Sequence, residues 1–335
     1  MRGRLLATFG ILASLLGIVI LLFTRHNSQP SESPRMLQAF LTALSTAGPA
    51  DSVEPQYLEA TDGTGLAYYA YIPHQPPLAQ LLFYHGGGAH SAAGYLHLAA
   101  RLRDRHRIST ILVDIRGHGA SKGTKGYARS AAQVWEDVRS LVQHFRRQQP
   151  DVPLFVGGHS SGAGLTLNYA SWEKREAVQG YVLLAPQLGR LSQTARPSDE
   201  INTFVTVRTW VFMLSGMTGG RLLGNTPAVF FDYPAELLAI DPGMTGSLTR
   251  NMAIAITPHA PQEQFAQLDR PFGLWIGSED ELFLPEAVTG YRGLAPPQLQ
   301  ESSESAILPN EKHLGILLGA HDSIGRWLQE RAKRD

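Results

Sequence analysis

The sequence contains no cysteine, and its acidic and basic residues balance to a formal net charge of zero. The first absence excludes disulfides and thiolate metal sites. The second argues against a nucleic acid or another polyanion as partner. Neither H-E-x-x-H nor G-x-x-x-x-G-K-[ST] occurs, so the sequence predicts no metal and no cofactor. What is present is an apolar chain of 335 residues, 43% hydrophobic, which can bury a large core.

A G-x-S-x-G pentapeptide, Gly158–Gly162, lies between two apolar stretches, 153–156 and 163–167. The first stretch predicts a buried strand and the second a helix. A serine on such a strand-to-helix turn is strained, and its neighbours must be small, which explains the glycines. An ordinary turn can show the same five letters, but the setting favours a nucleophile. Ser160 is therefore the predicted nucleophile of a serine hydrolase.

An acid and then a base are expected downstream of such a serine. The apolar run 272–276 predicts a strand, and it leads into a loop with three carboxylates at 279–281. A last predicted strand, 305–308, leads to His313. Residues alone leave the three carboxylates as alternatives for the acid.

Other histidines compete with His313 for the role of base. His159 adjoins the nucleophile, and adjacent side chains at a tight turn diverge. His259 precedes the acidic loop, and His321 lies in a predicted closing helix, 319–331, where a surface position is expected. By this elimination His313 takes the proton of the Ser160 hydroxyl.

Glycines after another predicted strand, 80–84, are suited to an oxyanion hole. That strand leads into His85-Gly86-Gly87-Gly88, where the backbone can approach a developing negative charge closely. We expect the N–H groups of Gly87 and Ser161 to be the two donors, and one such contact is worth about 3 kcal/mol. A plain glycine-rich turn and a phosphate cradle are the alternatives.

Three segments carry a family resemblance: His85–Tyr95, Asp114–Gly123 and Gly158–Gly162. They resemble the successive motifs of monoacylglycerol lipases and lysophospholipases, which are serine aminopeptidase S33-like members of the α/β-hydrolase superfamily. The resemblance covers residues 54–188 and 270–330, and it implies an α/β-hydrolase fold. It also implies Asp280 as the acid, because the family has a G-x-x-D loop after the corresponding strand. One departure is Ala89, where the family often has glutamate.

The resemblance implies hydrolysis of a carboxylic ester, monoacylglycerol or lysophospholipid, through an acyl-Ser160 intermediate. A serine aminopeptidase or amidase of the same superfamily is the close alternative. A catalytically silent hydrolase fold that only binds is a further alternative, and the complete set Ser160, Asp280 and His313 argues against it. The oligomeric state is left open.

The N-terminal run Leu5–Phe23 carries no charge and is flanked by Arg2, Arg4 and Arg25. At ~1.5 Å per residue it extends over about 29 Å, the thickness of a bilayer core, so it predicts a single membrane span. The flanking charges predict an external or periplasmic catalytic domain. A cleaved signal peptide and a secreted enzyme are the alternative. The predicted domains are an anchor at 1–26, a linker with a short helix at 27–52, and the hydrolase domain at 53–335.

Apolar strands alternate with helices from residue 66 to residue 185, which predicts a mostly parallel sheet with helices on both faces. The alternation stops between about 189 and 268. About 80 residues are far more than a compact connection needs, so they predict an inserted helical cap over the active site. Trp210, Phe212 and Met213 are the candidates to line an acyl-chain tunnel. A small helical core without ligand contact is the alternative.

Overall fold

The computed structural model describes residues 35–197, 205–218, 220–233 and 235–333. None of the helices in these ranges combines the length and the hydrophobicity of a membrane span. The longest described helix, α4 (Ala131–Gln148), has one buried apolar side and carries charged residues on the other, including Arg139 and Arg147. The finding contradicts the predicted single-pass localisation with an external catalytic domain, which is therefore corrected. The run Leu5–Phe23 itself lies outside the described residues.

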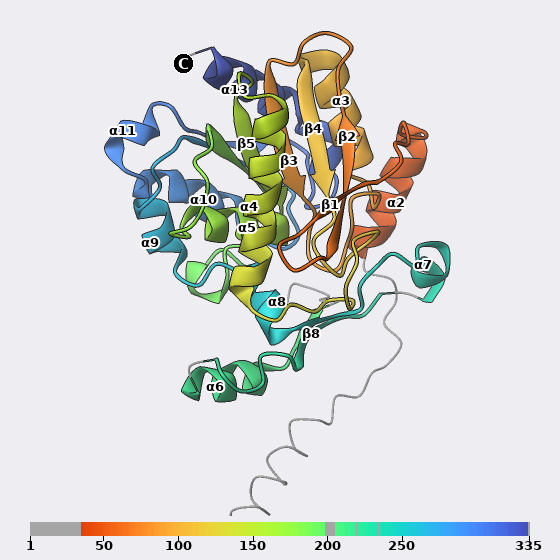
Figure 1. Ribbon diagram of the computed structural model, residues 1–335, viewed down its shortest axis with the longest axis vertical. Helices are drawn as coiled ribbons and strands as arrows, with labels where there is room; N and C mark the ends of the chain where they lie inside the picture. Colours follow the sequence, from red (N-terminus) through yellow and green to blue (C-terminus); the bar gives the residue numbers. More distant parts are fainter. Residues whose placement is uncertain (1–34, 198–204, 219, 234, 334–335) are drawn as a thin grey trace, which may run out of the picture. The chain divides into compact units, whose positions relative to one another are not determined.

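An eight-stranded sheet forms the centre of the hydrolase domain (Figure 1). Its strands lie in the order β1-β2-β4-β3-β5-β6-β10-β11. Only the pairings of β1 with β2 and of β2 with β4 are antiparallel, so the predicted mostly parallel sheet is confirmed. The bounds are β1 (Gln56–Glu59), β2 (Gly65–Tyr71), β3 (Ala79–Tyr84), β4 (Ile108–Val113), β5 (Leu154–His159), β6 (Gly180–Leu184), β10 (Phe272–Gly277) and β11 (Glu304–Leu308).

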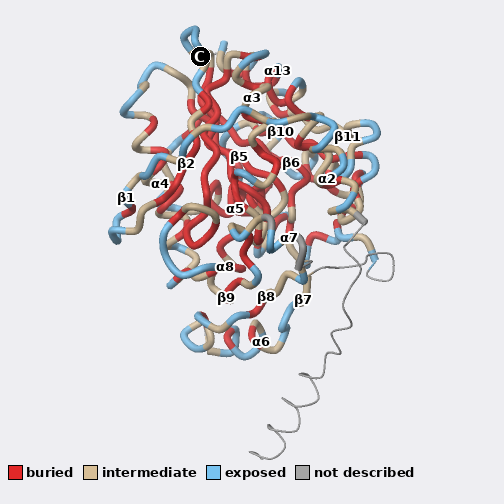
Figure 2. Tube along the Cα trace, turned by 90° about the vertical axis from the view of Figure 1, so that its right-hand side faces the viewer, coloured by how far each residue is buried: buried red, intermediate tan, exposed pale blue. Residues whose placement is uncertain are grey.

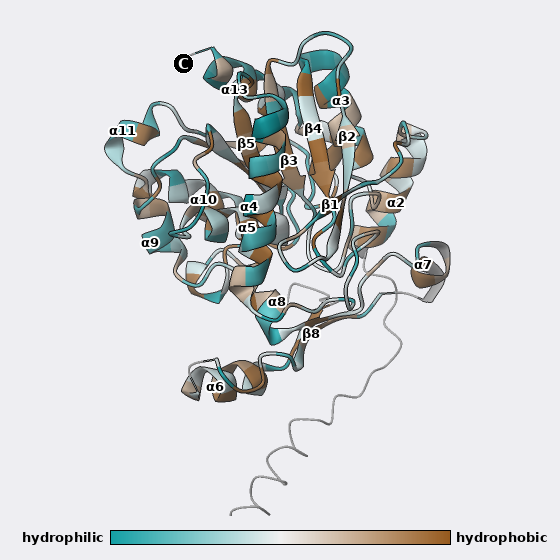
Figure 3. Cartoon of the chain, viewed as in Figure 1, coloured by the Kyte–Doolittle hydropathy of each residue, from teal (hydrophilic) through white to brown (hydrophobic). Residues whose placement is uncertain are grey.

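Every residue of β3, β4, β5 and β6 is buried, and Figure 2 shows this core as the red interior of the trace. Helices cover both faces of the sheet, so the strands need no polar side. On one face α3 and α13 pack together, and α4 and α5 cover the other (Figures 1 and 3). Besides α4, the helices around this sheet are α3 (Leu96–His106), α5 (Ser161–Ala170), α10 (Pro285–Thr289), α11 (Pro297–Gln300), α12 (Ile316–Gly319) and α13 (His321–Ala332).

The first described helix, α2 (Arg35–Ala47), packs on the hydrolase domain. Phe40 is only 6% exposed. A Cβ on Gly94 would overlap the Phe40 ring and would also meet Leu44, so the glycine makes room for this helix.

The insertion between β6 and β10 contains a three-stranded antiparallel sheet as well as helices. Its described elements are η1 (Arg190–Ser192), β7 (Val205–Val207), α6 (Thr209–Met217), β8 (Pro227–Phe231), α7 (Ala235–Ile240), β9 (Ser247–Thr249), α8 (Arg250–Ala255) and α9 (Pro261–Ala266). The prediction of a helical cap missed this sheet, whose strands are rich in Val, Phe and Thr, residues that favour extended backbone. The insertion is tied to the central domain, since the Thr245 N–H donates to the Gly88 carbonyl at 2.8 Å and the Thr249 N–H to the Gly126 carbonyl at 2.9 Å.

Candidate active site

Ser160 lies on the turn between β5 and α5, with φ 53° and ψ −118°. A non-glycine residue with positive φ is strained, and such strain gathers at functional sites. The turn also brings backbone segments too close for side chains. A Cβ on Gly158 would overlap the carbonyl carbon of Gly162, and a Cβ on Gly162 would overlap the carbonyl oxygen of Tyr84. Both glycines of the pentapeptide are thus required by contact, as the sequence predicts.

Asp280 and His313 form a buried pair, although 33 residues separate them in the sequence. Their side chains meet at 2.8 Å between His313 Nδ1 and Asp280 Oδ2. The other oxygen, Oδ1, accepts the N–H of Leu282 at 2.9 Å and that of Phe283 at 2.8 Å. Burial raises the pKa of Asp280, but the charge and hydrogen bond of His313 and these two amides together lower it below its ordinary value. The carboxylate therefore stays ionised and keeps the proton on Nδ1, which leaves Nε2 as the acceptor.

The competing side chains occupy other positions. Glu279 is exposed, and Glu281 accepts the backbone N–H of His313 at 2.9 Å, a contact that the sequence did not indicate. His259 is exposed. His321 was expected on the surface but is only 7% exposed, because its face of α13 packs against α3. The His159 ring lies 4.8 Å from that of His313, measured between centroids.

Gly87 and Ser161 lie beside each other next to Ser160. A Cβ built on Gly87 would lie 3.0 Å from Ser161 Oγ, and one on Gly86 would lie 3.5 Å from Ser160 Cβ. Neither the Gly87 nor the Ser161 N–H donates a hydrogen bond to another residue within the described ranges. Two unused donors beside a candidate nucleophile match the arrangement that an oxyanion hole needs.

Trp210, Phe212 and Met213 were the candidates to line an acyl-chain tunnel, and other cap residues lie against the glycine loop. Met213 is 70% exposed, so its side chain does not line an enclosed tunnel. Trp210 and Phe212 are partly buried, and Phe212 packs against the main core. By contrast, a Cβ on Gly88 would lie 2.7 Å from the Phe231 ring and would overlap the Tyr233 hydroxyl.

Phe231 and Tyr233 stack on each other, with centroids 5.7 Å apart and an interplanar angle of 22°. Phe231 also comes within 3.3 Å of a Cβ built on Gly87. This aromatic pair, defined as Phe231 and Tyr233, therefore lies against the candidate oxyanion loop. Among the described residues no cluster of three or more His, Asp or Glu side chains could hold a metal ion.

Comparison with known proteins agrees with this fold. The family described as serine aminopeptidase, S33, matches residues 75–298. The chain is 26% identical to monoglyceride lipase of Mus musculus over 279 residues, which cover 82% of this chain and 85% of the relative. It is 33% identical to monoglyceride lipase of Rattus norvegicus over 234 residues, or 68% of this chain and 73% of the relative. It spans only 25% of the length of a similar abhydrolase domain-containing protein of Dictyostelium discoideum.

Solved structures share the fold at low identity. A soluble variant of monoglyceride lipase from Saccharomyces cerevisiae, in complex with a substrate analog, superposes with a TM-score of 0.62 at 18% identity. The match covers 84% of this chain and 97% of that one. Est1E from Butyrivibrio proteoclasticus, bound to ferulic acid, gives 0.59 at 16% identity and covers 83% and 100%. With the family match over most of its length, the chain belongs to the serine aminopeptidase S33 family of α/β hydrolases and is a monoglyceride lipase-like hydrolase.

Proposed function

We propose that this chain is a serine ester hydrolase in which Ser160 is the nucleophile, His313 the base and Asp280 the acid. The observation that supports it most is the buried Asp280–His313 pair, whose imidazole ring lies 4.8 Å from the ring of His159, the residue just before Ser160 on the strained turn. Ser160 Oγ attacks the ester carbonyl carbon while His313 Nε2 takes its proton. The N–H groups of Gly87 and Ser161 stabilise the oxyanion. The C–O bond to the alcohol then breaks, and His313 returns the proton to the leaving oxygen. Water, activated by the same base, releases the acid from Ser160.

The proposed substrate is an uncharged lipid ester, monoacylglycerol first. Monoglyceride lipases of mouse and rat, matched over 85% and 73% of their length, support this choice. The aromatic pair beside Gly87 and Gly88 offers apolar surface for an acyl chain. Lysophospholipid is the second lipid to test, and the name of the family keeps an aminopeptidase activity as the rival.

One substrate panel tests these proposals together. It contains monoacylglycerols of graded chain length, a lysophospholipid of matched chain length, short-chain esters and peptide arylamides. We expect turnover of monoacylglycerols to exceed that of the others. Faster arylamide turnover would establish the aminopeptidase instead. A wild-type protein that neither turns over any ester nor reacts with a fluorophosphonate would show a silent fold.

A further inference from the structure

His159 lies at the centre of a chain of hydrogen bonds that joins the loops around Ser160. The Gly86 N–H donates to Tyr95 Oη at 2.7 Å. Tyr95 Oη lies 3.0 Å from His159 Nδ1, and His159 Nε2 lies 2.9 Å from the carbonyl oxygen of His313. The glycine loop, the nucleophile turn and the loop of the base are thereby connected through two side chains.

One arrangement of protons satisfies every polar atom of this chain. His159 is 1% exposed, and burial, followed by the proximity of His313, lowers its pKa to about 3, so the ring is neutral. Because Nε2 faces a carbonyl oxygen, it carries the ring proton and donates. Nδ1 then accepts a hydrogen bond from the Tyr95 hydroxyl, and the Tyr95 oxygen accepts one from the Gly86 N–H. All the hydrogen bonds therefore point along the chain from the glycine loop to His313.

Both polar groups of the His313 main chain form hydrogen bonds with side chains. Its carbonyl accepts from His159, and its N–H donates to Glu281 at 2.9 Å. At the other end of the chain, the Gly86 N–H belongs to the peptide just before the proposed donor Gly87. The hydrogen bonds thus fix the places of the base and of an oxyanion donor relative to each other.

We propose that His159 and Tyr95 are positioning residues, which hold His313 and the Gly86-Gly87 backbone in register with Ser160. This inference rests on the proposed esterase function. Misplacement of reacting groups by about 1 Å can cost ~100-fold in rate. The residues act through the geometry of the transition state, so their loss lowers kcat and leaves KM nearly unchanged.

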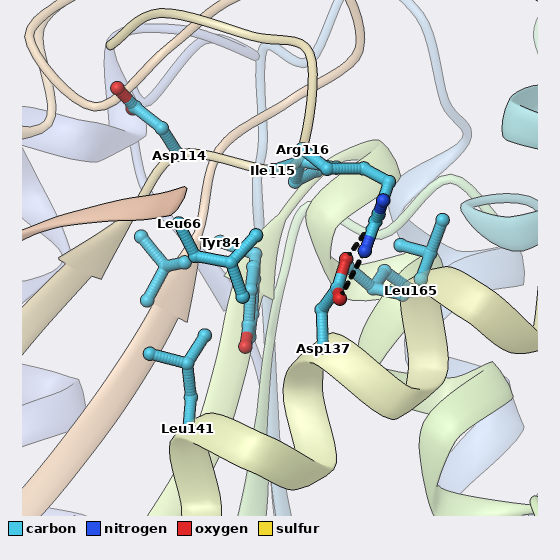
Figure 4. A pocket seen from close by; sticks show the side chains of 10 residues that line it. Leu66, Tyr84, Asp114, Ile115, Arg116, Asp137, Leu141 and Leu165 are labelled. Atoms are coloured by element: carbon cyan, nitrogen blue, oxygen red, sulfur yellow. Dashed lines mark hydrogen bonds and ion pairs between the residues drawn. The ribbon is translucent and has the colours of Figure 1, made fainter. Parts of the chain in front are cut away.

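The decisive comparison is Tyr95→Phe against Tyr84→Phe. Tyr84 is a matched control, because it is also 2% exposed and it ends β3, just before the glycine loop. Its hydroxyl has no hydrogen-bond partner within the described ranges. It lines a small cavity beside the Arg116–Asp137 ion pair (Figure 4). Tyr84→Phe therefore removes an equally buried hydroxyl and leaves the hydrogen bonds of Tyr95 and His159 intact.

We measure kcat and KM with a monoacylglycerol, per folded molecule, and melting temperature for each variant. Loss of one hydrogen bond with its partners left unsatisfied predicts about a tenfold lower kcat for Tyr95→Phe. KM should stay within about twofold, and Tyr84→Phe should stay within about twofold of wild type in both constants. Equal kcat in the two variants, or a loss that follows only the melting temperature, overturns the inference.

Substitution of His159 adds a rescue test. His159→Gln keeps a neutral donor and acceptor, whereas His159→Leu has neither. We expect Leu to lower kcat by about 100-fold and Gln to recover about tenfold of that loss. The pH profile of kcat/KM for Gln should keep the wild-type shape, because a neutral side chain replaces a neutral ring. Gln no better than Leu, or a shifted profile, counts against a positioning role.

If His159→Leu does not fold, the comparison of Tyr95→Phe with Tyr84→Phe decides whether the positioning role holds. A wild-type protein without ester turnover would overturn the proposed function, and it is measured before any variant. Active wild type with unaffected Tyr95→Phe overturns only the positioning role.

Discussion

The turn Gly158–Gly162 and the cap differ in the contacts that fix their structure. They therefore differ in how much of that structure the sequence predicts. At the turn, Gly158 and Gly162 are dictated by backbone within five residues or by the neighbouring strand end. In the cap, the residues that contact the candidate site, Phe231 and Tyr233, do so across about 140 residues of sequence. A steric requirement set by backbone atoms leaves a glycine motif, whereas a contact between side chains of the cap and the loop leaves only an aromatic residue among others.

The largest effect is expected at the turn, for the variant Ser160→Ala. If the strained turn presents the nucleophile, this variant should fold normally and lose about 10⁴-fold or more in ester turnover, because nothing else forms the acyl-enzyme. The measurement is kcat on a monoacylglycerol together with fluorophosphonate labelling. Near-normal turnover with ordinary labelling would remove Ser160 from the mechanism.

Asp280→Asn should follow with a loss of about 10³- to 10⁴-fold in kcat, because an amide no longer keeps the proton on His313 Nδ1. The same variant gives a prediction for pH. The pKa of Asp280 is lowered in the folded protein, so its contribution to stability is present above the ordinary carboxyl pKa of about 4 and is lost as the pH falls. The difference in melting temperature between wild type and variant should therefore narrow as the pH falls from about 4 to about 2.5. A constant difference over that range would contradict the assignment of the shift to Asp280.

Much of the central domain could be predicted from sequence because its rules are local. Continuous apolar runs between helices predicted the parallel sheet, and every residue of β3 and β5 is buried. The sequence alone could not single out the proposed acid, since 279–281 offered three chemically similar carboxylates. What singles out Asp280 is tertiary: burial, the amides of Leu282 and Phe283, and the ring of His313.

The features that the sequence did not predict depend on tertiary contacts, which leave no pattern of residue spacing in the sequence. His159 was set aside because adjacent side chains at the turn diverge, and its ring does turn away to meet a main-chain carbonyl. Met213 suggested an acyl tunnel by its chemistry, but it faces outward. The short strands β7, β8 and β9 stabilise one another only when the insertion folds. The sequence of any one of these segments therefore does not predict a strand.

Two glycine substitutions sharpen the contrast in stability. Gly162→Ala places a methyl group on the Tyr84 carbonyl oxygen and should destabilise the protein by about 1–3 kcal/mol. Gly216, in α6 of the cap, has nothing within 4 Å of a Cβ. There alanine should stabilise the helix by up to about 1 kcal/mol. Chemical denaturation measures both; equal effects of the two substitutions would show that the turn has more room than the contacts indicate.

The smallest expected effect separates the two parts of the cap. Each methylene of an acyl chain buried against Phe231 gains up to ~0.8 kcal/mol, so kcat/KM should rise with chain length until that surface is covered. Phe231→Ala should flatten this rise by about tenfold for long monoacylglycerols and change acetate esters little, because Ser160, Asp280 and His313 keep their places. Met213→Ala, at a side chain 70% exposed, should stay within about twofold on every ester. Equal losses on acetate and long-chain esters in Phe231→Ala would mean that the ring only holds the cap against Gly87 and Gly88. A chain-length effect confined to Met213→Ala would instead place specificity on α6, where the sequence first suggested it.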